Sequence, residues 1–86
     1  MKIVYHKNFI KSYKMLPQNL KSKVQNTILV FSKTPKAKSL RNHVLKGKLK
    51  GKRAISVTND YRIIFEEHDN YVVVIMLDLG THNQVY

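Results

Sequence analysis

The 86-residue chain carries four histidines, and two of them lie where catalytic side chains tend to collect. His43 lies in a basic segment just before the expected sheet, and His82 directly follows the most apolar strand candidate. Both are therefore at the ends of elements, where binding and catalytic residues are common. An imidazole exchanges protons near neutral pH, which suits general acid–base catalysis. The residues alone leave a second interpretation open, in which both histidines are exposed polar residues of loops.

The other two histidines fit structural roles. His6 precedes a helix, which favours a capping role, and His68 lies among acidic residues in an expected turn. No two histidines have the spacing of a zinc site, and the chain has no cysteine to complete one. The sequence also contains neither the phosphate-binding loop of NTPases nor the Gly-x-Ser-x-Gly turn of serine esterases. We therefore expect no metal and no cofactor, and no nucleotidase, protease or esterase activity.

Charge is distributed unevenly along the chain. There are 16 Lys and Arg residues against 5 Asp and Glu residues, a formal net charge of +11. Residues 1–59 contain no acidic residue, and Arg62 is the only Lys or Arg beyond position 53. A basic surface of this kind attracts polyanions through phosphate contacts and counterion release. We therefore expect a nucleic acid as the partner; the alternative is a lysine-rich surface that only keeps the protein soluble.

The elements that must position these side chains follow from the spacing of apolar residues. Helical spacing indicates two amphipathic helices, and alternating or continuously apolar runs indicate strands. A basic loop at residues 34–51 separates the two groups of elements. In chain order, the expected elements are a strand at 2–5, a helix at about 9–16, a helix at about 17–33, a short strand at 44–46, and strands at 52–57, 61–65 and 71–77.

This order predicts an α+β fold in a single domain over residues 1–86. The N-terminal strand and the C-terminal three-strand meander form a small antiparallel sheet, and the two N-terminal helices pack on one of its faces. The other face carries either Arg53 or Ala54, together with alternate residues such as Ser56 and Arg62. The sequence leaves this choice open because a one-residue shift in register exchanges the two faces of a strand.

The location of the protein is also an expectation. The longest apolar run, residues 71–77, is far too short to span a bilayer. The N-terminus lacks the apolar core and the cleavage site of a signal peptide. We therefore expect a cytoplasmic protein that does not enter a membrane.

Three segments taken together resemble the RelE/ParE superfamily of bacterial toxins. They are residues 40–47 (LRNHVLKG), 50–62 (KGKRAISVTNDYR) and 80–86 (GTHNQVY). The resemblance covers the whole chain, including the order of its elements, and is closest to the YafQ-like RNA-cleaving toxins. It implies a fold with two N-terminal helices on a small antiparallel sheet. It also implies a toxin that cleaves mRNA on the ribosome, stops translation and is neutralised by a cognate antitoxin protein.

The resemblance further implies which residues form the active site. The positions that match catalytic residues of the superfamily are His43, Asp60, His82 and Tyr86. YafQ-like members carry a further histidine in the middle of the strand that corresponds to residues 52–57. This chain has Ser56 at that position, so one acid–base group is missing. Side chains expected to bind RNA phosphates or bases are Lys46, Lys50, Lys52, Arg53, Tyr61 and Arg62.

These residue types suit a cut made without a metal ion. The 2′-hydroxyl of RNA attacks the adjacent phosphate, which requires a base, an acid for the leaving oxygen and positive charge. We expect His82 to be the acid and either Asp60 or His43 to be the base. Arg62 and Arg53 would hold the developing negative charge, and Tyr86 would position or stack on the RNA. Tyr61 would stack on a splayed base, or simply pack in the core.

Three other functions remain open at this stage. The first is a ParE-like toxin that poisons DNA gyrase, although acid–base residues are not needed for that activity. The second is an RNA-binding module without catalysis, which would use the basic loop and not the histidines. The third is an inactivated relative, which the serine at position 56 suggests.

Overall fold

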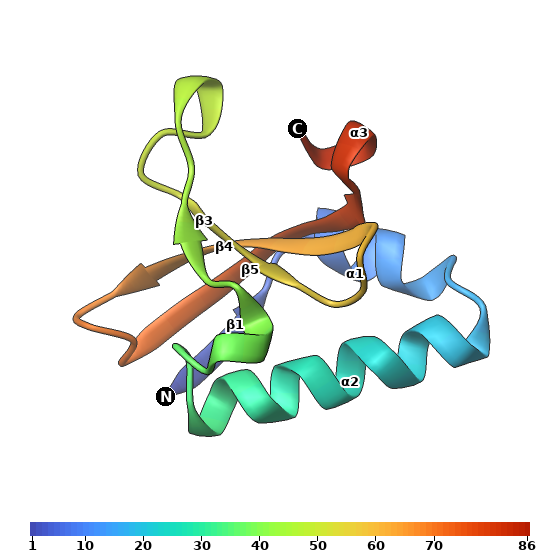
Figure 1. The fold of residues 1–86 in the computed structure, drawn as a ribbon, viewed down its shortest axis with the longest axis horizontal. Helices are drawn as coiled ribbons and strands as arrows, with labels where there is room; N and C mark the ends of the chain where they lie inside the picture. Colours follow the sequence, from blue (N-terminus) through green and yellow to red (C-terminus); the bar gives the residue numbers. More distant parts are fainter.

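A computed structural model describes residues 1–86 as a five-stranded sheet with its two N-terminal helices on one side and a short C-terminal helix on the other (Figure 1). The α+β fold expected from the sequence is confirmed. The elements in chain order are β1 (Lys2–Tyr5), α1 (Lys7–Lys14), α2 (Gln18–Lys33), a short 3-10 helix (Lys38–Leu40), β2 (His43–Val44), a second 3-10 helix (Gly47–Leu49), β3 (Arg53–Ser56), β4 (Tyr61–His68), β5 (Val73–Thr81) and α3 (His82–Val85).

The strands lie in the order β1-β5-β4-β3-β2. Strands β2 to β5 pair antiparallel, as expected for a meander, but β1 pairs parallel with β5. The sheet is therefore mixed rather than fully antiparallel. The strand expected to be central, β5, is an interior strand that pairs with β1 and with β4, although the middle of the sheet is β4. Its almost continuously apolar sequence fits a strand with helices on both faces, since Val74 and Met76 lie in the core beneath α1 and α2 and α3 packs over Gly80.

The core lies between the sheet and the two N-terminal helices. Phe9 of α1 and Val24 and Phe31 of α2 are buried against one face of the sheet. Phe31 meets Phe65 of β4 edge to face, with ring centroids 4.9 Å apart, a favourable arrangement for two aromatic rings. The sheet side chains in this core are Ile55, Ile63, Phe65, Val74, Met76 and Leu79. In Figure 1, α2 runs along this side of the sheet.

Register decides which residues of β3 and β4 face away from the helices. Ile55 lies opposite Ile63, and both side chains are in the core. Because side chains alternate along a strand, the residues between them project from the other face, which we call the open face. The open face therefore carries Ala54, Ser56, Arg62 and Ile64. Arg53 belongs to the helix-covered face, which answers the question that the sequence left open.

Local signals explain how the helices begin and end. The Nδ1 atom of His6 accepts a hydrogen bond of 3.0 Å from the backbone N–H of Asn8, so His6 is the N-cap of α1. Pro17 precedes α2, and Pro35 lies just beyond its end at Lys33, where a helix cannot easily continue. Neither of these helices, nor any other, has the length and apolar character needed to cross a membrane.

The strands of the last hairpin are longer than the sequence pattern predicts. The polar residues Glu66 to His68 continue β4 instead of forming the turn, because they pair with β5 at Val73 to Ile75. The turn itself contains Asp69, Asn70 and Tyr71, all with left-handed φ values between 56° and 71°. A bulge between Ile64 and Phe65 shifts the register near the middle of the hairpin. Beyond β5, the expected tail is the short helix α3.

Candidate active site

The open face brings together residues from four strands. One cross-strand row contains His43, Ala54, Ile64 and Asp78, and the adjoining row contains Ser56, Arg62 and Gly80. Directly opposite residues in antiparallel strands share a face of the sheet. The open face therefore carries His43, Ser56 and Arg62. The side chain of His43 is exposed, and those of the other two are half-buried.

Arg62 is held in place by the residue at position 56. Its Nη1 atom donates a hydrogen bond of 2.9 Å to the Oγ atom of Ser56, across the β3–β4 pair. Ser56 stands where the resemblance expects a histidine. A hydroxyl group does not exchange protons near neutral pH, but it can orient the guanidinium that lies beside it. The site therefore has a fixed positive charge at this point.

Helix α3 folds back over the open face. The backbone N–H of Thr81 donates to Oε1 of Gln84 at 2.8 Å, and the N–H of His82 donates to the carbonyl oxygen of Asp60 at 3.2 Å. A Cβ atom added to Gly80 would lie 2.8 Å from Oε1 of Gln84 and 3.1 Å from Cγ1 of Val85. Only glycine at position 80 therefore allows α3 to pack this closely against β5. In Figure 1, α3 and the β2–β3 loop both rise from the side of the sheet opposite α2.

The packing of α3 places His82 beside Tyr86. Their rings meet edge to face with centroids 4.4 Å apart. Tyr86 also borders a hollow of about 310 Å³, whose other lining residues come from the β2–β3 loop: Leu45, Lys46, Lys48 and Leu49. The end of the chain thus extends from β5 towards β2. The two strands are three positions apart in the sheet, which corresponds to roughly 14 Å.

The surroundings of Tyr86 disfavour the charged form of its phenol. Partial burial raises the pKa of Tyr86 above its usual value of 10.0, and the nearby positive charge of Arg62 lowers it in part. The phenol is therefore protonated at neutral pH and cannot serve as the base. Arg62 lies opposite Gly80, against which α3 packs, so the guanidinium and the α3 residues His82 and Tyr86 lie on the same face of the sheet.

The two candidate bases lie at different edges of this site. Asp60 lies in the β3–β4 turn, at the same end of the sheet as His82, and its carboxylate is exposed and has no ion-pair partner. His43 lies on the edge strand β2, and its Nδ1 atom is 2.8 Å from the carbonyl oxygen of Arg41. No three His, Asp or Glu side chains are grouped in a way that could hold a metal ion.

Two residues expected to contact RNA lie on the helix-covered face instead. Tyr61 pairs with Thr81, shares a face with Ile63 and borders a hollow with Leu16. Arg53 directs its Nε atom to Oδ1 of Asn42 at 2.8 Å. Neither side chain projects towards Arg62 and His82, so we leave both out of the active site.

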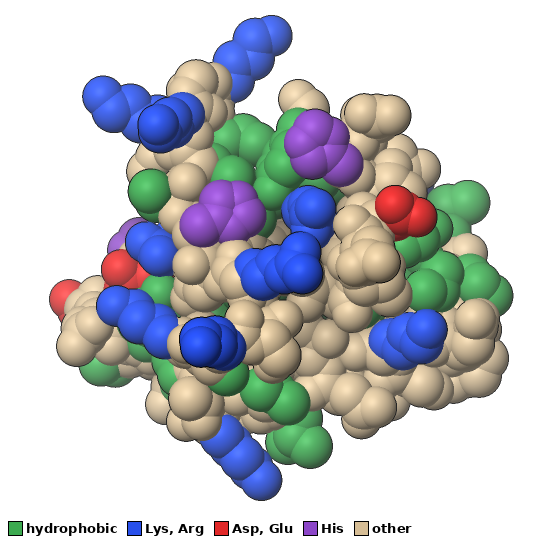
Figure 2. Space-filling view, viewed as in Figure 1, with side chains coloured by type: hydrophobic (Ala, Val, Ile, Leu, Met, Phe, Trp, Pro, Cys, Tyr) green, Lys and Arg blue, Asp and Glu red, His purple; other side chains and the backbone are tan.

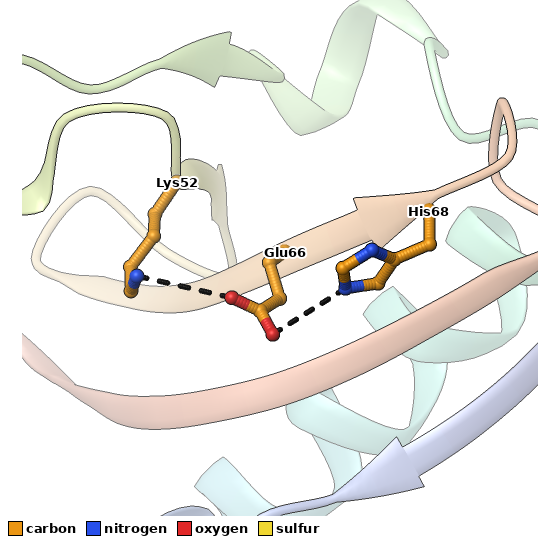
Figure 3. Close-up of polar contacts among 3 residues, drawn as sticks. All are labelled: Lys52, Glu66 and His68. Carbon is orange, nitrogen blue, oxygen red and sulfur yellow. Dashed lines mark hydrogen bonds and ion pairs between the residues drawn. The ribbon is translucent and has the colours of Figure 1, made fainter.

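The expected lysines differ in their surroundings. Lys46 borders the hollow beside Tyr86, and Lys50 is exposed in the same loop. Lys52 instead forms an ion pair with Glu66, with 3.8 Å between Nζ and Oε2. His68 approaches the other carboxylate oxygen at 3.4 Å, so Glu66 lies between two basic side chains (Figure 3). Because Glu66 offsets the charge of Lys52, this lysine is less available to a phosphate than the other two.

The surface around the site is strongly basic. Figure 2 shows Lys and Arg side chains over the β2–β3 region and the centre of the sheet, with histidine side chains near β2 and near α3. Acidic side chains are few on this face, with some at its left margin and another to the right of the centre, below α3. An elongated polyanion could therefore cross from the basic loop to α3 without meeting a cluster of like charges.

Sequence reasoning missed two residues that shape this site, Gly80 and Gln84. Both act by positioning α3 rather than by chemistry. A signal was present, because Thr81 and Gln84 form a Thr-x-x-Gln pattern that is typical of the start of a helix. The hydrogen bond from Arg62 to Ser56 had no such signal, because it depends on the register of two strands.

Comparisons with known proteins agree with this fold. A family model described as a bacterial toxin of type II toxin–antitoxin systems, YafQ, matches residues 1–86. YafQ from E. coli strain BL21(DE3) has a similar structure, with a TM-score of 0.83 and 20% sequence identity over 99% of this chain and 97% of that chain. The YoeB/ParE toxin from Agrobacterium tumefaciens has a TM-score of 0.80 and 19% identity over 95% and 99% of the two chains.

A third similar structure is a chain of the E. coli DinJ–YafQ complex. Its TM-score is 0.70 and its sequence identity is 25%, over 99% of this chain and 97% of that chain. A comparison with curated protein sequences gave no match. The similarity in structure extends over essentially the whole length of each chain.

Proposed function

This chain belongs to the YafQ family of type II toxin–antitoxin toxins, and we propose that it is an endoribonuclease that cleaves mRNA on the ribosome. The observation that carries the proposal is the grouping of Arg62, His82 and Tyr86 on one face of the sheet, where α3 packs over Gly80, the cross-strand neighbour of Arg62. This group lies next to the lysines of the β2–β3 loop. It combines an acid–base residue, a fixed cation and a phenol donor beside a basic surface.

The proposed reaction uses the RNA's own nucleophile. The 2′-hydroxyl oxygen forms a bond to the adjacent phosphorus, and the bond from phosphorus to the next 5′-oxygen breaks. A base takes the proton from the 2′-hydroxyl, and an acid gives a proton to the 5′-oxygen. The products are a 2′,3′-cyclic phosphate and a 5′-hydroxyl, so no external reagent is consumed.

The roles follow from the positions of the side chains. His82 is the general acid, because it lies at the start of α3 and packs against Tyr86. The base is His43 or Asp60, the two groups at the edges of the site. Arg62, oriented by Ser56, stabilises the charge that develops on the phosphate oxygens, where a preorganised cation is most effective. Tyr86 donates a hydrogen bond, since burial keeps its phenol protonated.

Binding of the substrate rests on the basic loop. Lys46, Lys48 and Lys50 are exposed and carry no ion pair, so they are free to contact phosphates. Such contacts release counterions and provide affinity without reading the sequence of the RNA. The ribosome offers a dense phosphate surface of the same kind, which supports cleavage of ribosome-bound mRNA.

The test of this function is expression of the wild type and of His82→Ala in bacterial cells, followed by mapping of mRNA 5′ ends. We expect the wild type to arrest growth and to create new 5′ ends, and His82→Ala to do neither. His68→Ala is the matched control, because it removes an exposed imidazole that lies outside the site. It should behave as the wild type does.

Other outcomes would assign a different function. Growth arrest that persists in His82→Ala with intact mRNA would contradict the ribonuclease and favour a gyrase-directed toxin. No arrest with either protein, combined with retained RNA binding, would favour a non-catalytic RNA-binding module. No arrest and no RNA binding would identify an inactivated relative.

The same chain is proposed to be neutralised by an acidic antitoxin segment. The E. coli relative is known in a complex with DinJ, and this chain has a surface suited to such a partner. A hollow of about 350 Å³ lies between α1 and α2 beside β1, and Tyr5 and Ile10 at its rim are each 40% exposed. Its lining is mostly apolar, and both helices carry lysines but no acidic residue.

Charge and shape together define the occupant of this hollow. An antitoxin segment with an apolar side chain flanked by Asp or Glu would fill the hollow and pair with the surrounding lysines. A disordered acidic segment of this kind gains order when it binds. The hollow lies on the helix side of the sheet, so this contact is separate from the proposed active site.

A further inference from the structure

The segment just before β2 is held by hydrogen bonds among residues that we do not propose to contact RNA. We propose that Asn42, Arg53 and Tyr71 form a clamp at this point. The clamp holds the His43 ring with its proton on Nδ1 and its Nε2 lone pair towards the open face. His43, rather than Asp60, is then the general base, so the inference rests on the proposed function and deepens it.

Asn42 is the centre of the clamp. Its Nδ2 atom donates to the carbonyl oxygen of Pro35 at 2.9 Å and to the hydroxyl of Tyr71 at 3.0 Å. Its Oδ1 atom accepts from Nε of Arg53 at 2.8 Å. The orientation of the amide has no alternative, because the guanidinium can only donate and a backbone carbonyl can only accept. Both amide hydrogens and the oxygen are therefore in use.

The partners of Asn42 are themselves anchored. The ring of Tyr71 packs against Phe31 and Phe65 of the core, with centroids 6.0 Å and 6.4 Å away. Arg53 begins β3 and lies opposite Phe65 on the helix-covered face. Asn42 is thus tied to the core, to the sheet and, through Pro35, to the end of α2. These anchors leave the chain little freedom as it enters β2.

The next residue, His43, turns to the opposite face. It pairs with Ala54, whose side chain belongs to the open face. Arg41, on the other side of Asn42, has a left-handed φ of 51° and directs its carbonyl oxygen to within 2.8 Å of Nδ1 of His43. Since a carbonyl oxygen only accepts, the neutral ring must carry its proton on Nδ1.

This arrangement is the one that a general base needs. With the proton on Nδ1, the Nε2 atom presents a lone pair, and the exposed ring is accessible to a 2′-hydroxyl. The carboxylate of Asp60 has no comparable support, because no hydrogen bond fixes it. Asn42, Arg53 and Tyr71 touch no substrate, so they are positioning residues. This gives Arg53 a different role from the phosphate contact that its charge suggests.

The first test is the ring-nitrogen NMR spectrum of His43 in the full-length protein, recorded where the ring is neutral. We expect the wild type to show a protonated Nδ1 and an unprotonated Nε2. Asn42→Ala should shift the ring to a mixture of the two forms, and Tyr71→Phe, which keeps the aromatic packing, should shift it in the same direction but less. A wild-type ring with its proton on Nε2 would overturn the proposal.

The second test is the rate of cleavage of a defined mRNA on purified ribosomes at saturating protein. Asn42→Ala should lower the rate constant by about 10- to 100-fold, as expected when a reacting group is misplaced. The concentration giving half the maximal rate should hardly change. Asn26→Ala, which removes an exposed asparagine from α2, is the matched control and should cleave at the wild-type rate.

The third test separates the clamp from a general effect on the protein. In a His43→Ala background, Asn42→Ala should cause no further loss, because the two residues act through one group. An equal loss in both backgrounds would show that Asn42 acts elsewhere, and would overturn the proposal. If the wild type cleaves no mRNA, the proposed function fails, while the NMR spectrum still decides whether the clamp holds His43.

Discussion

Serine at position 56 illustrates how a single residue can change role within an active site. Where the resemblance expects an acid–base residue, this chain has a hydroxyl that orients Arg62. The missing histidine therefore does not leave the position empty. In the proposed mechanism, His82 and His43 remain for proton transfer, and the cation gains a fixed orientation.

Replacement of Ser56 by alanine should lower activity without abolishing it. The variant removes the hydrogen bond to Nη1 of Arg62, and such a bond is typically worth about 0.5–1.5 kcal/mol. We therefore expect cleavage to slow by roughly 2- to 13-fold. The measurement is the single-turnover rate on ribosome-bound mRNA, with Ser32→Ala on α2 as control. An unchanged rate would mean that Arg62 does not depend on this contact.

Tyr5 should make the protein less stable in alkaline solution. Burial, with a smaller effect from Tyr13, raises the pKa of Tyr5 above its usual value of 10.0 in the folded state. Above about pH 10 the unfolded chain therefore loses this proton first, and ionisation favours unfolding. Stability from this group is present below that pH and is lost as the pH rises further. Urea unfolding at pH 9 and pH 11 should show a larger decrease for the wild type than for Tyr5→Phe; equal decreases would argue against the shift.

Helix α3 is short, but the geometry of the proposed site depends on it. It contains four residues, yet it brings both His82 and Tyr86 over the open face. Its position depends on close packing against Gly80 and on the bond between Thr81 and Gln84. An element this short has no stability of its own and depends on these contacts.

Gly80→Ala should lower the rate of cleavage without lowering the stability of the fold. The added Cβ would meet Gln84 and Val85, both in α3, while the buried core on the other face of the sheet is untouched. We expect cleavage to fall by about 10-fold or more, because a displacement near 1 Å is enough to impair catalysis. Urea unfolding should change little. Full activity in this variant would show that α3 is not held where the structure places it.

Viewed as a whole molecule, the protein has two surfaces of different chemistry to which we assign separate functions. The open face is basic and suited to RNA, whereas the hollow between α1 and α2 is apolar with lysines at its margin. A single acidic antitoxin could use both, but the two surfaces can be altered separately. Because the two surfaces are separate, RNA cleavage and inhibition by the antitoxin can be tested independently.

Binding of RNA should weaken steeply as salt increases. In the inactive His82→Ala protein, Lys46→Gln combined with Lys48→Gln should reduce the slope of log affinity against log salt by about 1.4, or about 0.7 for each phosphate that the protein no longer neutralises. The measurement uses a short single-stranded RNA. Lys23→Gln with Lys33→Gln on α2 is the control with the same change in charge, and its slope should stay near that of the parent. An equal effect of both pairs would remove the basis for a specific role of the loop.

Ile10→Asp should weaken the binding of the antitoxin to this chain. The variant places a carboxylate at the rim of the apolar hollow, where it opposes both the apolar and the acidic parts of the proposed partner segment. We expect cells that express the antitoxin to tolerate the wild type and to be arrested by Ile10→Asp. The RNA-cleavage rate of the purified variant should match that of the wild type. Continued neutralisation would place the antitoxin contact elsewhere.

The amino-acid sequence by itself determined the elements and the character of the surface. Apolar spacing located the two helices and the β3–β5 meander, because periodicity follows directly from helix and strand geometry. The excess of Lys and Arg, with no acid before Asp60, indicated a polyanionic partner. The positions of His43 and His82 at element ends pointed to the site.

Only the tertiary structure decided which side chains meet. Periodicity groups Arg53 with Ile55 and Tyr61 with Ile63, but it cannot say which group faces the helices, because that depends on contacts between distant segments. The parallel pairing of β1 with β5 and the ion pair of Lys52 with Glu66 are likewise long-range contacts. The packing of the helices against Ile55 and Ile63 determines that Arg62 lies on the open face and that Arg53 does not.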